Sequence, residues 1–276
     1  MYYFKNILLI TVSILVVCTA QQCGFNQQYQ VGSATYYYGY ETGACSFGDL
    51  FGKTAPGTPY IAALSESFFD GAKMCGVCFE ITSPYTNKTI TVYSTDLCPS
   101  GGVCSRPYHF DLSYDAFTQL GEASLGELEN LKWRQVACGN MPSMGIKLKD
   151  GSNPSWVAYL VYNSIVQILS VEVQLFGQSN WIMLQRESYN YWVDSNDHTA
   201  GPYKVRVTSI LNEKIVIDIK EIVAEKVISS YQQFQAPGCA AAELNIEASG
   251  STSITLRGIT NIVFLLLLST LISMLI

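Results

Sequence analysis

Two aspartates, Asp96 and Asp111, are the side chains of this sequence best suited to chemistry. Asp96 begins the segment DLCP, and Asp111 lies at the centre of the segment HFDLS, residues 109–113. An aspartate that apolar and aromatic neighbours desolvate has a raised pKa and can hold a proton near neutral pH. Each is therefore a candidate catalytic acid. A structural alternative for Asp111 is that it caps the helix that begins just after it.

The residues around these aspartates predict short strands that would hold them. β-branched and aromatic runs, separated by Gly, Pro, Asn and Ser, occupy residues 34–38, 77–81, 89–93 and 131–137. Runs of this length between turn signals are typical of the strands of a barrel. Residues 113–120 differ, because a serine at the N-cap position and an apolar face predict a short helix.

A second block, residues 141–239, alternates apolar and polar residues more clearly and contains no long amphipathic pattern. We expect it to be a compact β-sandwich that follows a first domain at residues 21–140. Its predicted strands lie at residues 157–162, 165–176, 182–185, 203–210 and 214–219.

The N-terminal residues 1–20 contain one lysine, an apolar run and then small residues. This order predicts a cleaved signal peptide, and the alternative is an uncleaved membrane anchor.

The C-terminal residues 259–276 are almost wholly apolar, and the small residues 249–251 precede them at a short distance. This arrangement predicts a signal for attachment of a GPI anchor. The alternative is a transmembrane helix, since the run is close to the ~20 residues that a bilayer needs. Both readings place the protein outside the cell, anchored to the plasma membrane or in a wall or matrix. Residues 240–258 would be a tether.

Composition narrows the classes of partner. The formal net charge is −6 and only 14% of the residues are charged, so a nucleic-acid partner, which needs a basic face, is not expected. Eight of the nine cysteines follow the predicted signal peptide, which indicates a disulfide framework in an oxidising compartment. Cys75 and Cys78 have the spacing of a zinc or redox pair, but the chain has only 2 histidines, so no metal or cofactor is expected. Asn87 begins a sequon for N-glycosylation.

Several motifs of the first block, in this order and spacing, resemble the expansin family. They are ATY at 34–36, GAC at 43–45, ALS at 63–65, CGVCFEI at 75–81, DLCP at 96–99, and HFDLS at 109–113 with Ala116 and Phe117. The resemblance implies an all-β protein, in which a six-stranded double-psi β-barrel precedes an immunoglobulin-like β-sandwich. The barrel would be similar to the catalytic domain of family 45 endoglucanases.

The resemblance also assigns roles to three barrel residues. Thr35, Asp96 and Asp111 match positions that matter for wall loosening, and Asp111 matches the catalytic acid of the related endoglucanases. An inverting glycosidase needs a second carboxylate ~6.5–9.5 Å from the acid. In the related endoglucanases this base follows a Thr-x-Tyr stretch, and the matching residue here is Gly39.

Three carboxylates remain as alternative bases. Glu41 and Asp49 are near Gly39 in the sequence but belong to the following loop. The family resemblance places Asp96 beside Asp111, where it would instead tune the pKa of that residue.

The second block resembles the carbohydrate-binding module of expansins, whose flat aromatic strip stacks on sugar rings. Trp156 and Tyr189 are the best matches to this strip. Trp181, Tyr191 and Trp192 are further candidates, for which a place in the hydrophobic core is the alternative.

The expected disulfides also come from the resemblance, which implies Cys45–Cys75, Cys78–Cys138 and Cys98–Cys104. Cys23 and Cys239 then remain as a hypothetical tie between the domains. The whole pattern predicts a non-enzymatic protein that binds cellulose or a related β-glucan and loosens or lubricates it. The alternatives are a weak endoglucanase of the family 45 type and a passive wall-binding matrix protein.

Overall fold

A computed structural model gives the structure of the protein and describes residues 23–39, 42–51, 58–199 and 201–243. The predicted signal peptide, the predicted anchor and most of the predicted tether lie outside these residues. None of the helices in the described ranges combines the length and apolarity that crossing a membrane requires. The described residues all belong to one compact unit.

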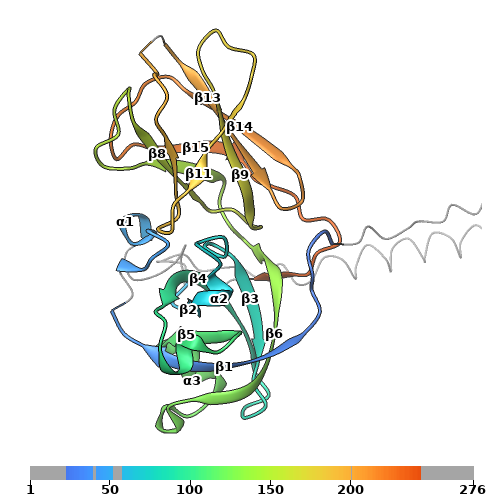
Figure 1. Ribbon diagram of the computed structural model, residues 1–276. Coiled ribbons are helices and arrows are strands. Elements are labelled where there is room, and N and C mark those ends of the chain that lie inside the picture. The colour runs from blue at the N-terminus through green and yellow to red at the C-terminus, as the bar shows by residue number, and fades with distance from the viewer. Residues whose placement is uncertain (1–22, 40–41, 52–57, 200, 244–276) are drawn as a thin grey trace, which may run out of the picture. The chain divides into compact units, whose positions relative to one another are not determined.

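Six strands of the first block close into a barrel (Figure 1). Strand β1 is the closing strand, because it pairs in parallel with β5 on one side and antiparallel with β6 on the other. Around the barrel the order is β1 (Gln30–Tyr37), β5 (His109–Ser113), β2 (Ile61–Ser65), β4 (Thr89–Cys98), β3 (Cys78–Thr82) and β6 (Leu128–Gly139).

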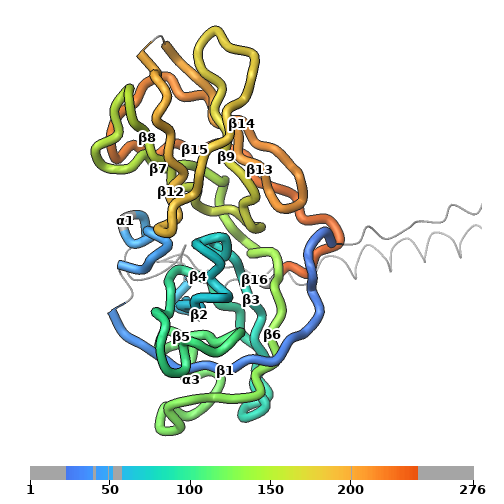
Figure 2. The backbone as a smooth tube through the Cα atoms, viewed as in Figure 1, coloured from blue at the N-terminus to red at the C-terminus, as the bar shows by residue number. Residues whose placement is uncertain are grey.

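A seventh strand corrects the predicted tether. β16 (Ala241–Glu243) pairs in parallel with the end of β6, so the first residues of the segment 240–258 belong to the barrel sheet. Figure 2 shows this last described segment beside β6. Local sequence reasoning missed it because three small or polar residues carry no strand pattern of their own, and their partner lies about a hundred residues earlier.

Short helices lie in the connections of the barrel. They are α1 (Gly48–Phe51), α2 (Glu66–Phe69), η2 (Gly102–Ser105), α3 (Tyr114–Leu120) and η3 (Ala123–Leu125). The helix predicted at 113–120 is confirmed as α3, with Ser113 at its N-cap position. Ser113 precedes α3, but its side chain makes no capping bond. Its hydroxyl instead donates to the carbonyl of Pro59 at 2.6 Å and accepts the N–H of Ile61 at 3.3 Å. Ser113 therefore joins β5 to the start of β2.

The second block is a sandwich of two antiparallel sheets, which completes the predicted all-β architecture. The predicted strands at 157–162 and 214–219 are confirmed. One sheet has the order β10 (Ile182–Met183), β9 (Ile168–Gln174), β13 (Tyr203–Ser209) and β14 (Lys214–Ile219). The other has the order β11 (Gln185–Arg186), β12 (Tyr191–Asp194), β8 (Val157–Tyr162), β7 (Met144–Leu148) and β15 (Val227–Gln232).

Strand β8 explains how the two blocks share buried surface. All six of its residues are buried, because both of its faces are covered. Its odd-numbered residues Val157, Tyr159 and Val161 belong to the core of the sandwich. Its even-numbered residues Ala158, Leu160 and Tyr162 belong to the same hydrophobic cluster as the barrel core.

Candidate functional site

The predicted polar residues of the barrel lie in one row across four neighbouring strands. Thr35 of β1 is paired with Asp111 of β5, Asp111 with Ala63 of β2, and Ala63 with Asp96 of β4. Residues paired in this way point to the same side of a sheet. The strand register thus brings together Thr35, Asp111 and Asp96, which we call the polar row.

The carboxylate of Asp111 is half-buried and held by Thr35, whose hydroxyl donates to Oδ1 at 2.7 Å. Asp111 therefore does not cap the following helix, which was its structural alternative in the sequence analysis. Burial raises the pKa of Asp111, the Thr35 hydrogen bond lowers it, and the negative charge of Asp96 raises it, with a net increase. Sγ of Cys98 lies 4.0 Å from Oδ2, but Cys98 is bonded to Cys104 and has no proton to donate.

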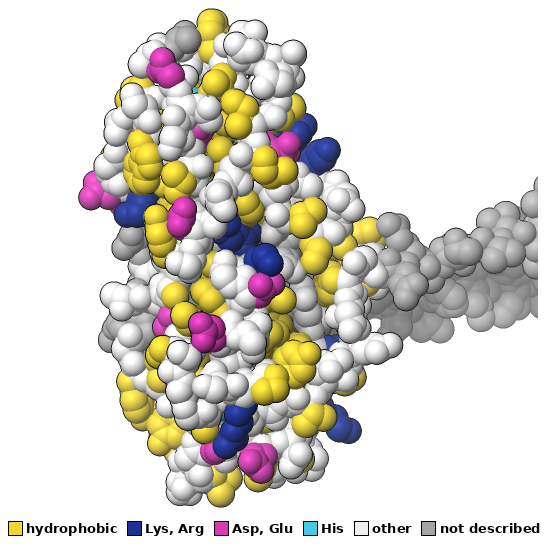
Figure 3. Space-filling model, in the orientation of Figure 1, with side chains coloured by type: hydrophobic (Ala, Val, Ile, Leu, Met, Phe, Trp, Pro, Cys, Tyr) yellow, Lys and Arg dark blue, Asp and Glu magenta, His cyan; other side chains and the backbone are white. Residues whose placement is uncertain are grey.

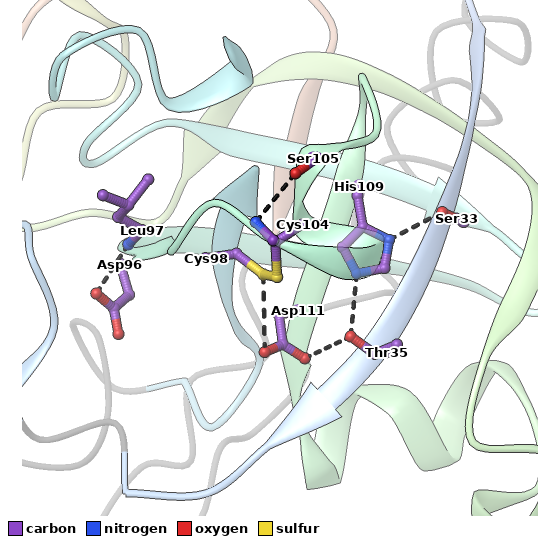
Figure 4. Close-up of a disulfide and its surroundings, with 10 residues drawn as sticks. Ser33, Thr35, Asp96, Leu97, Cys98, Cys104, Ser105, His109 and Asp111 are labelled. Carbon is purple, nitrogen blue, oxygen red and sulfur yellow. Dashed lines mark hydrogen bonds between the residues drawn. A yellow bond between two sulfur atoms is a disulfide. The ribbon is translucent and has the colours of Figure 1, made fainter. Parts of the chain in front are cut away.

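A buried histidine, His109, is linked to this carboxylate through the hydroxyl of Thr35 (Figure 4). Its Nδ1 is 2.8 Å from the hydroxyl of Ser33 and its Nε2 is 3.0 Å from the hydroxyl of Thr35. Burial lowers the pKa of His109 to about 4, so the ring is neutral near pH 7. Because Thr35 gives its only proton to Asp111, Nε2–H must donate to Thr35, and Ser33 must donate to Nδ1.

Asp96 is held by the loop that follows β1. Its Oδ1 accepts the backbone N–H groups of Ala44 at 2.6 Å and of Leu97 at 2.8 Å. Burial raises the pKa of Asp96 and these two bonds lower it, and the net result is an increase. Gly43 permits the close approach of the loop, since a Cβ there would lie 2.6 Å from the carbonyl oxygen of Thr95.

The position expected for a catalytic base, residue 39, carries no carboxylate. Gly39 has a φ of +79°, and a Cβ built on it would have no atom within 4 Å. Glu41 and the side chain of Asp49 lie outside the described residues. In the described part of the chain, the carboxylates of the polar row are those of Asp111 and Asp96.

Two of the five candidate aromatic residues have accessible rings beside the five-stranded sheet. Tyr189 is 38% exposed and lies just before β12, and Trp156 is half-buried just before β8. Tyr191 and Trp192 are only 3% and 5% exposed, so the core alternative holds for both. Trp181 precedes β10 of the other sheet, and the guanidinium of Arg206 covers its ring at 4.1 Å.

A cavity of about 430 Å³ lies between the loop that follows β1, which holds Asp96, and Tyr189 of the second block. Its lining includes Gly43 and Ser46 from the loop, and Lys149, Tyr189 and Tyr191 from the second block. The hydroxyl of Ser46 donates to the carbonyl of Tyr189 at 2.8 Å, so the two segments are in direct contact. The face shown in Figure 3 has wide uncharged areas between scattered acidic and basic side chains.

The structure also describes the predicted disulfides, the glycosylation sequon and one group of candidate metal ligands. The cysteines form four disulfides, Cys23–Cys239, Cys45–Cys75, Cys78–Cys138 and Cys98–Cys104, the same pairs as those named from the sequence. Asn87 is exposed in the turn between β3 and β4, the setting that glycosylation of its sequon would need. His109 lies within 4.8 Å of Cys98 and Cys104, but a disulfide offers no thiolate, so this group does not fit a metal site.

Comparison with known proteins identifies relatives of both blocks. Residues 1–132 match the model of the expansin N-terminal domain. Expansin-like protein 1 of Dictyostelium discoideum is 40% identical over 234 residues, which cover 84% of this chain and 82% of that protein. Expansin-B4 of Arabidopsis thaliana is 28% identical over 242 residues, covering 80% of this chain and 92% of that protein.

A solved structure is similar over most of the described chain. It is an Asp-to-Asn mutant of the Clavibacter michiganensis expansin in complex with cellohexaose, with 26% identity and a TM-score of 0.66. The likeness covers 75% of this chain and 98% of the bacterial one.

Proposed function

This chain belongs to the expansin family, and we propose that it binds cellulose or a related β-glucan outside the cell and loosens it without cleaving it. Two observations carry the proposal: the polar row holds a supported acid, Asp111, and Gly39, at the position that the resemblance gives to the base, has no carboxylate. Binding of cellohexaose by the bacterial relative supports the choice of polymer.

Binding would combine an aromatic face with a polar groove. Tyr189 and Trp156 offer rings to the apolar C–H faces of glucose units, and Lys149 and Asp96 offer polar groups to the hydroxyls. The cavity between Gly43 and Tyr189 would let one glucan chain contact both blocks.

Loosening would then be an exchange of hydrogen bonds. Glucan chains adhere to one another through hydroxyl groups, and each such bond contributes a net ~0.5–1.5 kcal/mol in water. Asp111 and Asp96 are held in fixed positions by Thr35 and by backbone N–H groups, and their remaining lone pairs can accept sugar hydroxyls. Replacing sugar-to-sugar bonds by protein-to-sugar bonds therefore has a small net free energy and needs no bond cleavage.

A weak endoglucanase is the second candidate function, and one observation favours it. The raised pKa of Asp111 keeps a larger fraction of this carboxyl protonated, as a general acid requires. A passive matrix protein, in which the barrel is only structural, is the third.

A paired assay separates the three functions. We expect Asp111→Asn to reduce the creep of cellulose-containing wall strips severalfold while release of reducing sugars stays at background for both proteins. Tyr189→Ala should lower retention on insoluble cellulose, and the matched Tyr85→Ala, at an exposed tyrosine in the turn between β3 and β4, should not. Sugar release that disappears in Asp111→Asn would establish the endoglucanase. Unchanged creep in Asp111→Asn would favour the passive protein.

The location that fits this function is the wall or matrix outside the cell. We also propose that the segment 259–276 directs attachment of a lipid anchor. Phosphatidylinositol-specific phospholipase C should then release the protein from cells, whereas a transmembrane helix would resist it.

A further inference from the structure

A second cavity, of about 470 Å³, opens on the barrel away from the polar row. Four aromatic side chains form one part of its wall, namely Phe68, Phe79, Tyr108 and Trp133. Uncharged polar side chains form most of the rest, namely Asn26, Gln28, Gln30, Ser67 and Gln135. Asp70, Met74 and Pro107 complete the lining, and Asp70 is its one charged residue. No residue of the polar row lines this cavity, and its lining contains no Lys or Arg.

The aromatic wall is a packed unit with one accessible edge. The rings of Tyr108 and Trp133 are 5.1 Å apart and tilted by 52°, and Phe68 lies 5.5 and 4.8 Å from them. Trp133 is 6% exposed, whereas Tyr108 is 41% exposed. A ligand would therefore meet Tyr108 first and reach the other rings behind it.

The backbone holds Tyr108 in this place against its own preference. Its φ is +56°, a left-handed conformation that bulky residues rarely adopt. Gly32 of β1 makes the arrangement possible, since a Cβ there would lie 2.3 Å from the carbonyl oxygen of Tyr108 and 3.2 Å from Nε1 of Trp133. The surroundings of Tyr108 therefore enforce this conformation.

Two side chains of the wall have hydrogen-bond donors without partners. Nε1 of Trp133 and Nε2 of Gln135 are buried and bond to no described group. A buried donor is costly when it stays unpaired, and a ligand oxygen that reached it after a small side-chain shift would remove this cost.

We propose that this cavity binds one neutral sugar residue, a chain end or side branch of a wall polysaccharide. Aromatic rings match the C–H faces of a pyranose, and amides with both donors and acceptors match its hydroxyls. The absence of Lys and Arg from the lining leaves an anionic sugar without a counter-charge.

The site is separate from the polar row because the two use opposite faces of β5. Successive side chains of a strand point to opposite faces. Phe110 faces the aromatic wall, with its ring 5.7 Å from that of Trp133, and its neighbour Asp111 faces Thr35. The barrel would thus hold two parts of a polysaccharide network at once.

Ligand-observed NMR on the purified protein tests the proposal with the methyl β-glycosides of glucose, galactose, mannose and xylose, and with glucuronate as the anionic comparison. Tyr108→Asn removes the ring and keeps a residue that tolerates a positive φ. Trp133→Phe removes the indole N–H and keeps an aromatic ring. The matched control is Tyr231→Asn, because Tyr231 is 88% exposed with a φ of +57° and lies outside the cavity.

The wild type and Tyr231→Asn should bind at least one neutral glycoside saturably and equally well. Tyr108→Asn should weaken this binding at least tenfold, and Trp133→Phe about fivefold, as expected for the loss of one hydrogen bond. Retention on insoluble cellulose should change less than twofold in both, which keeps this result distinguishable from failure of the proposed function. Equal affinity in Tyr108→Asn, no saturable neutral glycoside, or tighter binding of glucuronate would overturn the proposal.

Discussion

The side chains of His109, Thr35 and Asp111 act as one hydrogen-bonded unit, because only one arrangement of donors and acceptors fits them. Thr35 has a single proton and gives it to Asp111, so the histidine must supply the next one. The sequence pointed to both aspartates and to Thr35 but gave His109 no role. The sequence did contain a signal for His109, namely its spacing. Ser33 and Thr35 are two residues apart, as are His109 and Asp111, and residues with this spacing share a face of a strand.

The neutral state of His109 gives the protein a specific dependence of stability on pH. The pKa of His109 is 6.5 in the unfolded chain and about 4 in the folded protein, so the unfolded state binds more protons between these values. The free energy of unfolding should therefore fall by about 3 kcal/mol as the pH drops from 6.5 to 4. The raised pKa values of Asp111 and Asp96 act in the opposite direction, since protonation of these carboxyls stabilises the folded state.

Urea unfolding at pH 7 and pH 4 measures this dependence, with His109→Gln as the control. Glutamine keeps hydrogen-bonding groups but does not titrate, so the acid-induced decrease should be smaller in the variant by the contribution of His109. The contributions of the carboxyls remain, including those of Glu80 and Asp194, whose lowered pKa values also reduce stability in acid. An identical change with pH in both proteins would exclude His109 as its source.

At the scale of elements, patterns within one segment were predictable and contacts between segments were not. The sandwich strands at 157–162 and 214–219 follow from their own residues. β2 is buried throughout and has no alternation to reveal it. Ser113 looked like a helix cap, yet its hydroxyl bonds to Pro59, a partner that local sequence cannot show. The family resemblance, rather than periodicity, supplied the barrel topology.

The turn after β1 is the element where hydrolysis is expected to be recoverable. Gly39→Asp places a carboxylate where the related endoglucanases have their base, with open space around the new Cβ. The positive φ of this turn should cost about 1 kcal/mol of stability, because aspartate tolerates such a conformation less well than glycine. We expect low but measurable release of reducing sugars from amorphous cellulose.

Gly39→Asn is the matched control for this experiment, since it has the same shape and backbone strain without the negative charge. Release from Gly39→Asp that survived the additional change Asp111→Asn would show that the activity does not use the polar row, contrary to the expectation.

At the scale of the whole molecule, the family resemblance implied three of the disulfides, whereas the fourth, which joins the two ends of the described chain, was only a hypothesis. Cys23 and Cys239 are 216 positions apart and form one disulfide, and β16 follows directly in the barrel sheet. The aromatic residues divide by burial, which depends on how the sheets pack. Sequence alone therefore left Tyr191 and Trp192 between surface and core.

Loss of this long-range disulfide should reduce stability more than loss of a short one. A cross-link that closes a longer loop removes more entropy from the unfolded chain. We expect the double change Cys23→Ser and Cys239→Ser to lower the free energy of unfolding by about 2–4 kcal/mol. The matched pair Cys98→Ser and Cys104→Ser, with a separation of 6, should cost less. Equal losses in denaturant unfolding would contradict the loop-closure explanation.

The position of β16 also determines how the molecule would carry mechanical load. A pull on the chain beyond Glu243 first meets the hydrogen bonds between β16 and β6, which lie side by side and share a shearing force. When these yield, tension passes from Cys239 through the disulfide to Cys23 and along the chain into β1. This route reaches the strand of Thr35 through the disulfide, without crossing the sandwich.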